Sequence, residues 1–330
     1  MTGEKSEFVS LYERERKKIE KKLHSALADR KPFSLYKPAA YILQSGGKRL
    51  RPLLVLFSAK AAGGKFSAVY NAAAAVELLH NFTLVHDDIM DNAGKRRGRD
   101  TLHKKYDLST AILAGDSLLS VAYEYLLKDC NGNAKQVLSS FTKGLVEVCE
   151  GQSLDKEFET RKNVSIDEYL LMINKKTAAM AEMCCTIGAI LGGGGKSEIK
   201  ALAEYGKNIG MAFQIQDDLL DISANEKKFG KVVGGDLVEG KKTFLFLKAM
   251  KIARGNDKKM LQKLIVQKGI SKSEVPQYKT LYEKLGVIEE SKKEIKFYSD
   301  KALSSIKKIK KKEDRKLFSE LVDSLIKRNK

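Results

Sequence analysis

The chain has 330 residues, of which 43% are hydrophobic and 31% are charged, and this composition predicts a folded globular protein rather than a disordered one. It has only four prolines, which favours helices over an all-β fold with its many turns. The formal net charge is +19, from 61 basic and 42 acidic residues. Such an excess indicates either an anionic partner (nucleic acid, an anionic membrane surface or a phosphorylated substrate) or simply a lysine-rich proteome.

Signals for export and membrane insertion are weak. The N-terminal sequence MTGEKSEF carries charges where a signal peptide needs an apolar segment. No uninterrupted apolar run approaches the ~18–20 residues of a membrane span, and the four cysteines suit a reducing compartment. We therefore expect a cytoplasmic protein without a transmembrane segment. The basic, amphipathic C-terminal segment 291–330 leaves peripheral membrane contact as an open alternative.

Apolar residues recur at helical spacing along most of the chain. In chain order, helices are expected at 5–28, 53–62, 69–91, 108–128, 134–154, 166–191, 197–224 and over most of 242–328. Pro32 and Pro38 are expected to break the chain after the first helix, and the glycine-containing segments 92–100 and 225–240 are expected to be loops and candidate lids. Because the connections are short, we expect one all-α domain over residues 1–330.

Two D-D-x-x-D motifs lie 130 residues apart on expected helices. The first is Asp87, Asp88 and Asp91 within FTLVHDDIMD, and the second is Asp217, Asp218 and Asp221 within FQIQDDLLD. On a helix, the first and last positions of such a motif stand one turn apart on the same face. Clustered carboxylates repel one another unless cations neutralise them, and hard oxygen ligands favour Mg²⁺. Both motifs have strongly apolar flanks, unlike solvated acidic faces, so the pair predicts two carboxylate groups that cage a diphosphate through bridging metal ions.

Basic residues accompany these motifs and the glycine turns. They are Lys48 and Arg51 around the first glycine pair, Arg96 and Arg97 after the first motif, and Lys231 and Lys241 around the second glycine-rich loop. Fixed cations beside metal-bridged phosphates form a clamp on an anchored or departing anion. Each alone reads as an ordinary surface charge in so basic a chain, but their places beside the motifs predict phosphate contacts.

The sequence resembles the trans-isoprenyl diphosphate synthases, a polyprenyl synthetase family, over essentially its whole length. The matching stretches are GGKRLRP at 46–52, HNFTLVHDDIMDNAGKRRG at 80–98, KTA at 176–178, FQIQDD at 213–218 and GKVVGGDLVEGKKT at 230–243. The resemblance implies an all-α isoprenoid synthase fold, with a single large helical bundle around a deep central cavity, and a homodimer. It also implies that an allylic diphosphate ionises with about three Mg²⁺ ions bound, for which Mn²⁺ substitutes. Isopentenyl diphosphate then attacks the cation, and proton loss leaves a trans chain lengthened by one isoprene unit.

The resemblance further implies residue roles. The metal ligands are Asp87, Asp91 and Asp217 with Asp88, Asp218 and Asp221 in support, the isopentenyl diphosphate ligands are Lys48, Arg51, His80 and Arg97, and the allylic diphosphate ligands are Arg96, Lys176, Lys231 and Lys241. Thr177 and Gln214 match groups that offer oxygen dipoles to the developing cation, and together with Lys176 they form the implied catalytic set. Spacing agrees in part, because His80 lies two helical turns before Asp87.

Product length is expected to depend on Thr83 and Phe82, the residues four and five positions before the first motif. A bulky residue there forms the floor of the pocket in this family, and Phe82 with the short first motif resembles geranylgeranyl diphosphate synthases (C20) of the archaeal-like type. We therefore expect mainly C20 from C5, C10 and C15 primers. A farnesyl (C15) synthase or a bifunctional C15/C20 synthase is the alternative. Helical geometry does not itself support the floor role, since five residues turn ~500°, which is about 140° away from Asp87.

Three other functions fit less well. A terpene cyclase also ionises allylic diphosphates with a DDxxD motif, but it usually lacks the isopentenyl diphosphate clamp that Lys48, Arg51 and Arg97 resemble. A non-catalytic partner subunit typically loses an aspartate motif, and this chain has both. A nucleic-acid binder suits the net charge, but the sequence has no recognition motif or aromatic stacking pattern. Diphosphate substrates are therefore the expected partners, and nucleic acid is not.

Overall fold

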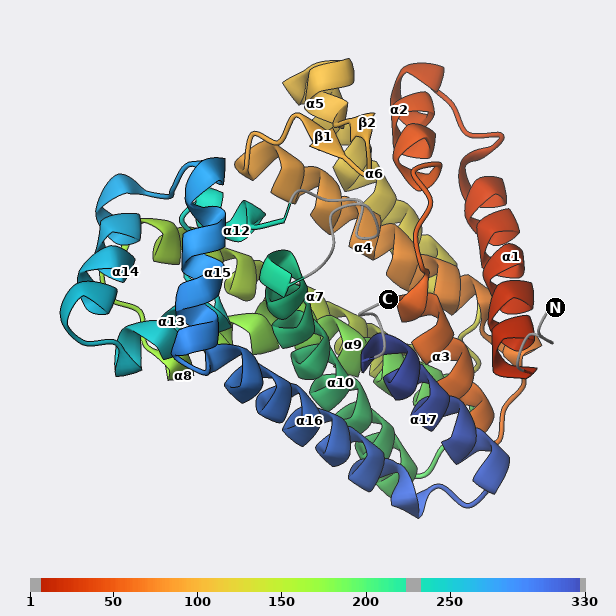
Figure 1. Cartoon of the computed structure of the whole chain (residues 1–330). Helices are drawn as coiled ribbons and strands as arrows, with labels where there is room; N and C mark the ends of the chain where they lie inside the picture. Colours follow the sequence, from red (N-terminus) through yellow and green to blue (C-terminus); the bar gives the residue numbers. More distant parts are fainter. Residues whose placement is uncertain (1–6, 224–232, 327–330) are drawn as a thin grey trace, which may run out of the picture. The chain divides into compact units, whose positions relative to one another are not determined.

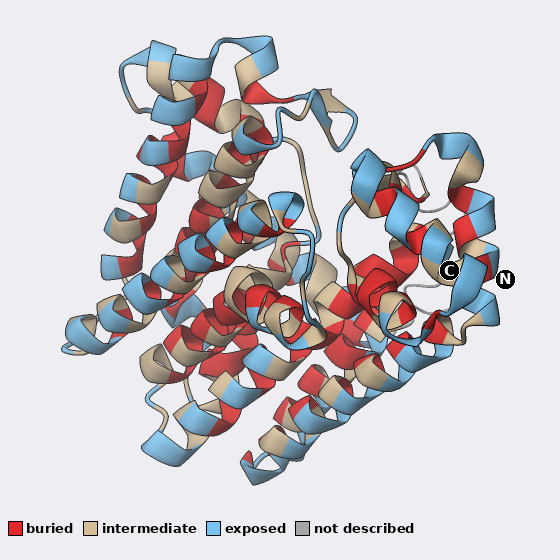
Figure 2. Cartoon of the chain, turned by 90° about the vertical axis from the view of Figure 1, so that its left-hand side faces the viewer, coloured by how far each residue is buried: buried red, intermediate tan, exposed pale blue. Residues whose placement is uncertain are grey.

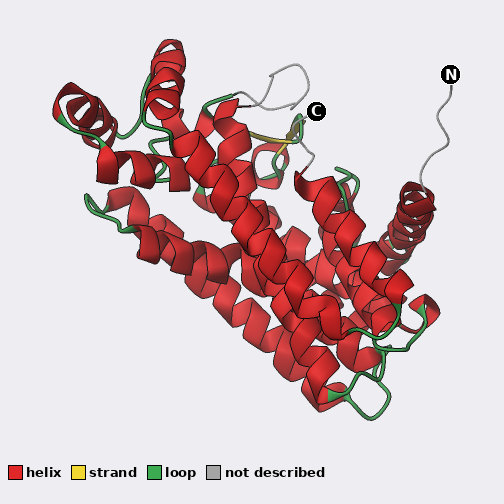
Figure 3. Cartoon of the chain, turned by 60° about the horizontal axis from the view of Figure 1, so that its bottom comes forward, coloured by secondary structure: helices red, strands yellow, loops and turns green. Residues whose placement is uncertain are grey.

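The computed structural model describes residues 7–223 and 233–326. Helices form most of this part of the chain, and its sheet is the short antiparallel hairpin of β1 (Lys95–Arg96) and β2 (Arg99–Asp100) (Figure 3). The predicted all-α class is therefore confirmed. Within the two described ranges, no helix is long and apolar enough to cross a membrane.

The chain divides into two compact units. The first comprises residues 1–141, 184–202 and 309–317, and the second comprises residues 142–183, 203–308 and 318–330. Both units receive residues from α7 (Ala134–Thr160), α9 (Ala179–Leu191), α10 (Lys196–Ser223) and α17 (Lys312–Ile326). The expectation of a single domain over residues 1–330 stays a prediction.

The first unit is built around one central helix, α4. Its elements before α7 are α1 (Glu7–Leu27), α2 (Phe33–Leu43), α3 (Leu50–Ala61), the short helix η1 (Phe66–Ala68), α4 (Tyr70–Met90), the hairpin, α5 (Leu102–Lys105) and α6 (Leu108–Leu127). Helix α4 packs against α6, α3, α1 and α2 (Figure 1). Residues 72–75 are four alanines with no exposed surface. Alanine favours the helix, and its small side chain lets neighbouring helices come close. The first aspartate motif therefore lies at the end of a tightly packed helix.

The second unit has an aromatic core. Its further elements are α8 (Ile166–Ile173), the π-helical turn η2 (Asn174–Ala178), α12 (Gly235–Val238), α13 (Phe244–Ile252), α14 (Gly255–Gln267), η3 (Lys272–Glu274), α15 (Val275–Lys284), α16 (Val287–Ser305) and η4 (Ile306–Lys308). Helix α13 packs against α8, α14 and α16, and α15 packs against α16. Phe244 and Phe246 of α13 and Tyr278 and Tyr282 of α15 are buried in this core. In Figure 2, buried and exposed residues alternate along most helices.

The expected helices are found, with local differences. A short helix, α12, lies in the expected loop 225–240, and the helix expected at 166–191 is interrupted by the π-helical turn η2. Three further differences follow. Helix α2 continues through Pro38, which was expected to break the chain, and only Pro32 stands outside it, as the N-cap. A proline inside a helix removes one backbone hydrogen bond, and here the buried apolar residues of α2 outweigh that loss. Helix α7 runs to Thr160 rather than 154, since Phe158 is buried there. The third difference is that 92–100 contains the hairpin and is not only a loop.

Candidate active site

The first aspartate motif lies at the C-terminal end of α4. Asp87 and Asp88 belong to its last turn, and Asp91 is the C-cap, whose N–H donates to the carbonyl of Asp87 at 2.9 Å. Asp87 is half-buried and Asp91 is exposed. The C-terminus of a helix carries a partial negative charge of about half an electron, so additional carboxylates are unfavourable there unless cations neutralise them. This placement suits a cation-binding site, and the local backbone alone gives no reason for it.

The middle aspartate of this motif points into the protein. Asp88 is 1% exposed, and its carboxylate accepts a hydrogen bond from Nε of Arg96 at 2.7 Å. Burial raises the pKa of Asp88, and the nearby Arg96 opposes that shift only in part. Asp88 therefore joins the end of α4 to β1, and its assignment as a supporting metal ligand stays a prediction.

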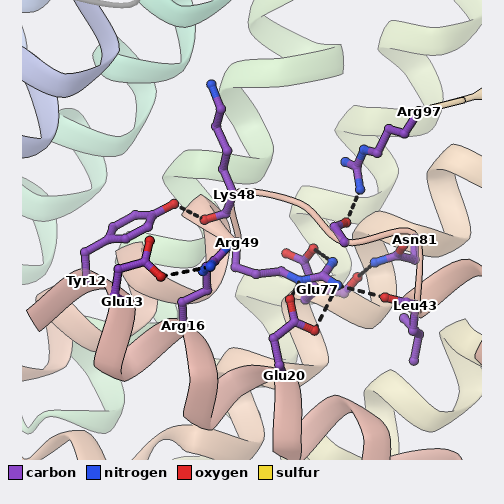
Figure 4. A network of polar contacts seen from close by, with 11 residues as sticks. Tyr12, Glu13, Arg16, Glu20, Leu43, Lys48, Arg49, Glu77, Asn81 and Arg97 are labelled. Carbon is purple, nitrogen blue, oxygen red and sulfur yellow. Dashed lines mark hydrogen bonds and ion pairs between the residues drawn. The ribbon is translucent and has the colours of Figure 1, made fainter. Parts of the chain in front are cut away.

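The hairpin turns Arg97 back onto the first glycine pair. Arg97 and Gly98 have φ of 52° and 77°, the left-handed pair of a two-residue hairpin turn. The Arg97 guanidinium donates to the carbonyl of Gly46 (Figure 4). A Cβ on Gly47 would lie 3.0 Å from Nη1 of Arg97, so glycine leaves the space that this guanidinium occupies.

The other residues expected to bind isopentenyl diphosphate lie beside this contact. Nη1 of Arg51 is 3.3 Å from Nε2 of His80. Burial, and then the charges of Arg51 and Arg97, hold the pKa of His80 well below its usual value. Since arginine only donates, the neutral imidazole accepts at Nε2 and carries its proton on Nδ1. Lys48 is exposed and extends away from the surrounding polar network (Figure 4). The first unit thus brings together Arg51, His80 and Arg97 near Lys48.

Phe82 and Thr83 lie on α4 one turn before the motif, and both are half-buried. The ring of Phe82 packs against the imidazole of His86 with 4.5 Å between centroids, and Nδ1 of His86 is 3.1 Å from the carbonyl oxygen of Phe82. Nε2 of His86 also lies 3.5 Å from Asp116 of α6. These contacts hold the imidazole of His86, against which the Phe82 ring packs. The Thr83 hydroxyl donates to the carbonyl of His80 at 2.8 Å, which is a hydrogen bond within α4.

The second motif shows the same inward-facing middle aspartate. Asp218 is 7% exposed and accepts from the Tyr169 hydroxyl, from the N–H of Phe244 at 2.9 Å and from Nε2 of Gln214 at 3.2 Å. Burial and the nearby Asp236 carboxylate raise the pKa of Asp218 to about 7. Asp217 and Asp221 are half-buried. Asp221 also accepts from the N–H of Asp236 at 3.1 Å and so helps to fix α12.

A pocket of about 140 Å³ opens beside this motif in the second unit. Its lining includes Asp155, Lys176, Thr177, Gln214, Asp218, Asp236 and Lys241. The Thr177 hydroxyl donates to Oε1 of Gln214 at 2.9 Å, so the two oxygen-bearing side chains expected to face the cation are in contact. Lys231, which was expected to contribute here, lies outside the described residues.

The lysines of this pocket have acidic partners that sequence reasoning missed. Lys176 pairs with Asp155, and Lys241 lies 2.7 Å from Glu239 and 3.5 Å from Asp236. Burial opposes the charge of Lys241, but Asp236 and Glu239 outweigh it, so its pKa is raised and the ammonium is kept charged. Asp236 stands in the glycine-rich stretch between two of the expected phosphate ligands, which is a signal that could have found it.

A π-helical turn shapes the backbone at Lys176. The turn η2 covers Asn174–Ala178, and such turns are frequent at functional sites. Gly151 of α7 lies against it, since a Cβ there would be 2.2 Å from the backbone nitrogen of Lys176. Glycine at 151 is therefore what lets α7, with Asp155 one turn further on, approach Lys176.

Comparison with known proteins decides the family. The family described as polyprenyl synthetase matches residues 33–284. The chain belongs to this family. A geranylgeranyl diphosphate synthase of Sulfolobus acidocaldarius is 42% identical over 245 residues, which cover 73% of this chain and 74% of that protein.

Solved structures of this family are similar over nearly the full length of the chain. The geranylgeranyl pyrophosphate synthetase of Pyrococcus horikoshii Ot3 has a TM-score of 0.90 at 37% identity, covering 97% of this chain and 98% of that one. A polyprenyl synthase of Caulobacter crescentus CB15, complexed with calcium and isoprenyl diphosphate, has a TM-score of 0.89 at 27% identity and covers 98% of this chain and 97% of its own. The fold and family expected from the sequence are confirmed.

Proposed function

We propose that this polyprenyl synthetase condenses isopentenyl diphosphate with C5, C10 and C15 allylic diphosphates and releases mainly geranylgeranyl diphosphate (C20). Family membership supports the prenyl transfer, and similarity to a geranylgeranyl diphosphate synthase supports the product length. The observation that carries the proposal is the pair of aspartate motifs, each with its first and last carboxylates more exposed than its middle one. Ordinary acidic helix faces have no reason to repeat that arrangement.

The basic cluster of the first unit would hold isopentenyl diphosphate. Arg51 and Arg97 supply planar guanidinium donors for phosphate oxygens, and Lys48 adds an exposed ammonium. Neutral His80 adds no charge of its own, and its contact with Arg51 orients that guanidinium. All these groups are fixed cations or their supports, so this subsite binds an anion without needing a metal ion.

Lys176 and Lys241 of the second unit would act on the allylic diphosphate, to which the sequence resemblance also assigns Arg96. Lys176 pairs with Asp155, Lys241 lies beside Asp236 and Glu239, and both ammonium groups would grip the leaving diphosphate. The allylic C–O bond breaks with its electron pair going to the diphosphate, and the isopentenyl double bond forms the new C–C bond before a proton is lost. The oxygens of Thr177 and Gln214 would face the cation as fixed dipoles.

The carboxylates fit a divalent cation. Within residues 7–223 and 233–326, no three His, Cys, Asp or Glu side chains come close enough to hold a metal ion by themselves. Mg²⁺ usually binds one or two carboxylates and keeps waters or substrate phosphates as its other ligands, which suits motifs whose first and last carboxylates are more exposed than the middle one. Asp87, Asp91 and Asp217 would hold about three Mg²⁺ ions, which would stabilise the negative charge that develops on the leaving diphosphate. The carboxylates of Asp88 and Asp218 accept hydrogen bonds from other groups of the protein. These two residues would therefore position the metal ligands.

A homodimer is also part of this proposal. Helix α6 exposes Leu108, Ile112, Leu113 and Leu127, with exposed fractions from 38% to 58%. Large apolar side chains gathered on one helix are typical of an interface. Sedimentation equilibrium tests this, and a monomer at micromolar concentration would contradict it.

Chain-length analysis of the products tests the proposed function. The purified protein receives Mg²⁺, isopentenyl diphosphate and, in turn, C5, C10 and C15 allylic diphosphates. We expect predominant C20 from all three primers. Mainly C15, or C15 with C20, would indicate the farnesyl or bifunctional alternative. A folded protein that elongates none of them would overturn the proposal.

Replacing Phe82 with alanine is expected to shift the main product from C20 to C25 or longer. The ring of Phe82 is held against His86 on α4, one turn before Asp87, and its removal would leave room for a longer chain. Phe66→Ala is the matched control, since it truncates another half-buried phenylalanine in the same unit, far along the chain from the motif. If both variants keep the wild-type product profile, Phe82 is not the floor.

Replacing Gly47 with alanine is expected to raise the KM for isopentenyl diphosphate about tenfold, since small displacements of binding groups have effects of that size. The added Cβ would lie 3.0 Å from the Arg97 guanidinium and push it away. Gly63→Ala is the control: its φ of +99° also lies in the region where alanine is strained, but a Cβ there meets nothing within 4 Å. Initial rates at varied isopentenyl diphosphate measure both, and equal KM values for the two variants would contradict the role of Arg97.

A further inference from the structure

Helix α1 lies outside the residues that the family model matches, yet its side chains reach the loop that carries Lys48 and leads into α3, whose first turn holds Arg51. The Tyr12 hydroxyl donates to the backbone carbonyl of Lys48, and Glu20 accepts from Arg49 (Figure 4). Both contacts fall on residues 48–51, next to the expected isopentenyl diphosphate ligands. Helix α1 is therefore in direct contact with the framework of that subsite.

Arg49 is the centre of this contact, and it faces the protein interior. Its side chain has no exposed surface, although it stands between two residues expected to bind a phosphate. Its Nε and Nη2 donate to the two oxygens of Glu20 at 2.8 and 3.2 Å, Nη1 donates to Glu77 at 2.6 Å, and Nη2 donates to the carbonyl of Leu43 at 2.8 Å. A guanidinium occupied in this way does not bind substrate.

The backbone of Arg49 is unusual as well. It is the N-cap of α3 with φ of 50° and ψ of 38°, the left-handed region that residues other than glycine seldom adopt. Such a conformation persists only where the surroundings hold it, and the contacts with Glu20, Glu77 and Leu43 supply that restraint. The left-handed residue sends the Arg49 side chain inward and leaves Lys48 exposed.

The two acidic partners connect Arg49 to both sides of the subsite. Glu77 is 3% exposed and lies on α4, one turn before His80, which contacts Arg51. Glu20 lies on α1. A buried ion pair seldom adds net stability over an apolar replacement, but its directed hydrogen bonds fix the relative positions of the elements that it joins. Here the geometry it specifies is the spacing between the loop and α4.

We propose that Arg49, held by Glu20 of α1 and Glu77 of α4, is a positioning residue of the isopentenyl diphosphate subsite, and that α1 is part of that subsite through Glu20 and Tyr12. The inference rests on the proposed function, since it concerns one of its two substrates. It assigns to α1 a role in recognition of the non-allylic diphosphate. It also gives these residues different roles: Arg49 holds the loop in position, whereas Lys48 and Arg51 contact isopentenyl diphosphate.

The test uses variants that each remove only some of the hydrogen bonds around Arg49. Arg49→Lys keeps the charge but loses the forked donors, Glu20→Gln alters the partner on α1, which is 40% exposed on its side chain, and Tyr12→Phe removes the bond to Lys48. We expect the KM for isopentenyl diphosphate to rise about 10- to 100-fold in Arg49→Lys and less in the other two, since displacements near 1 Å cost up to that much. The KM for the allylic diphosphate is expected to stay within about twofold, because its ligands are not tied to this network.

Glu13→Gln is the matched control, since it breaks an ion pair with Arg16 on the same helix, 2.8 Å long, that does not touch the loop. We expect wild-type KM values for it. Thermal unfolding of every variant is recorded alongside. If Arg49→Lys fails to fold, Glu20→Gln and Tyr12→Phe decide the question. A lower melting temperature with both KM values unchanged would mean a purely structural role and overturn the inference while the proposed function stands. A wild-type protein without elongation would overturn both.

Discussion

Replacing Asp87 with asparagine is expected to lower kcat by ~10³-fold, because the loss of one ligand from a catalytic cation site costs about 4 kcal/mol of transition-state stabilisation. Asparagine keeps the size and one oxygen of the side chain but removes its charge. Asp87 lies in the last turn of α4, where the partial negative charge of the helix end disfavours a carboxylate, so removing the charge relieves that unfavourable interaction. Steady-state rates at saturating substrates, with thermal unfolding measured in parallel, check both parts.

Asp300→Asn serves as the control for this prediction. Asp300 is 60% exposed on α16 and pairs with Lys296 one turn earlier, so the variant removes the same charge at a surface ion pair. Such pairs contribute little, and wild-type kcat is expected. An Asp87→Asn enzyme that keeps wild-type kcat would show that the first motif does not act on the reacting diphosphate.

The helices and the motif positions could be predicted from the sequence because both depend on local periodicity. Helix α4 was expected at 69–91 and runs from Tyr70 to Met90. The hairpin at Arg96 and Arg97 was missed because strands of two residues show no alternation, and only the turn residues Arg97 and Gly98 could have indicated it. The break expected at Pro38 was wrong because packing of α2 outweighed a local preference.

Which aspartate of each motif faces outward also follows from helical geometry once the buried side is known. Adjacent residues point about 100° apart on a helix, so Asp87 and Asp88 cannot face the same way. The structure buries Asp88 against Arg96 and Asp218 against Tyr169. These partners come from other elements, and no spacing rule names them.

The same holds for the basic residues. In the sequence, Lys48, Arg49 and Arg51 look alike, and only the structure shows that Arg49 is buried between two glutamates. The partners of Lys176 and Lys241 were missed for the related reason that sequence gives charges but not their pairing. Asp155 lies 21 residues before Lys176 and meets it only because Gly151 lets α7 come close.

Removal of divalent cations is expected to reduce elongation below ~10⁻³ of the Mg²⁺-loaded rate, because stabilisation of the developing charge by several kcal/mol would be lost. Protein treated with a chelator and dialysed is assayed with and without added MgCl₂. Restored activity with Mg²⁺, and with Mn²⁺ as a substitute, would show that the loss comes from the metal and not from unfolding.

The two substrates are expected to differ in how strongly their binding depends on Mg²⁺. Binding measurements test this difference without any turnover. Isopentenyl diphosphate is proposed to bind to Lys48, Arg51 and Arg97, which carry fixed positive charges, so its Kd in calorimetry should change less than about threefold when Mg²⁺ is withheld, the residual effect being screening. A non-reactive allylic diphosphate analogue is proposed to bind beside carboxylates that repel it until cations intervene. Metal and analogue are then thermodynamically linked, and each should strengthen the binding of the other by the same factor.

Asp87→Asn should reduce that linkage and leave the Kd for isopentenyl diphosphate unchanged, since no ligand of that subsite is altered. Arg97→Gln should do the reverse. If both diphosphates lose affinity equally when Mg²⁺ is withheld, the division into a metal-dependent and a metal-independent subsite is wrong. The basic residues of the first unit would then act as a general attraction for anions, which a net charge of +19 supplies to any diphosphate.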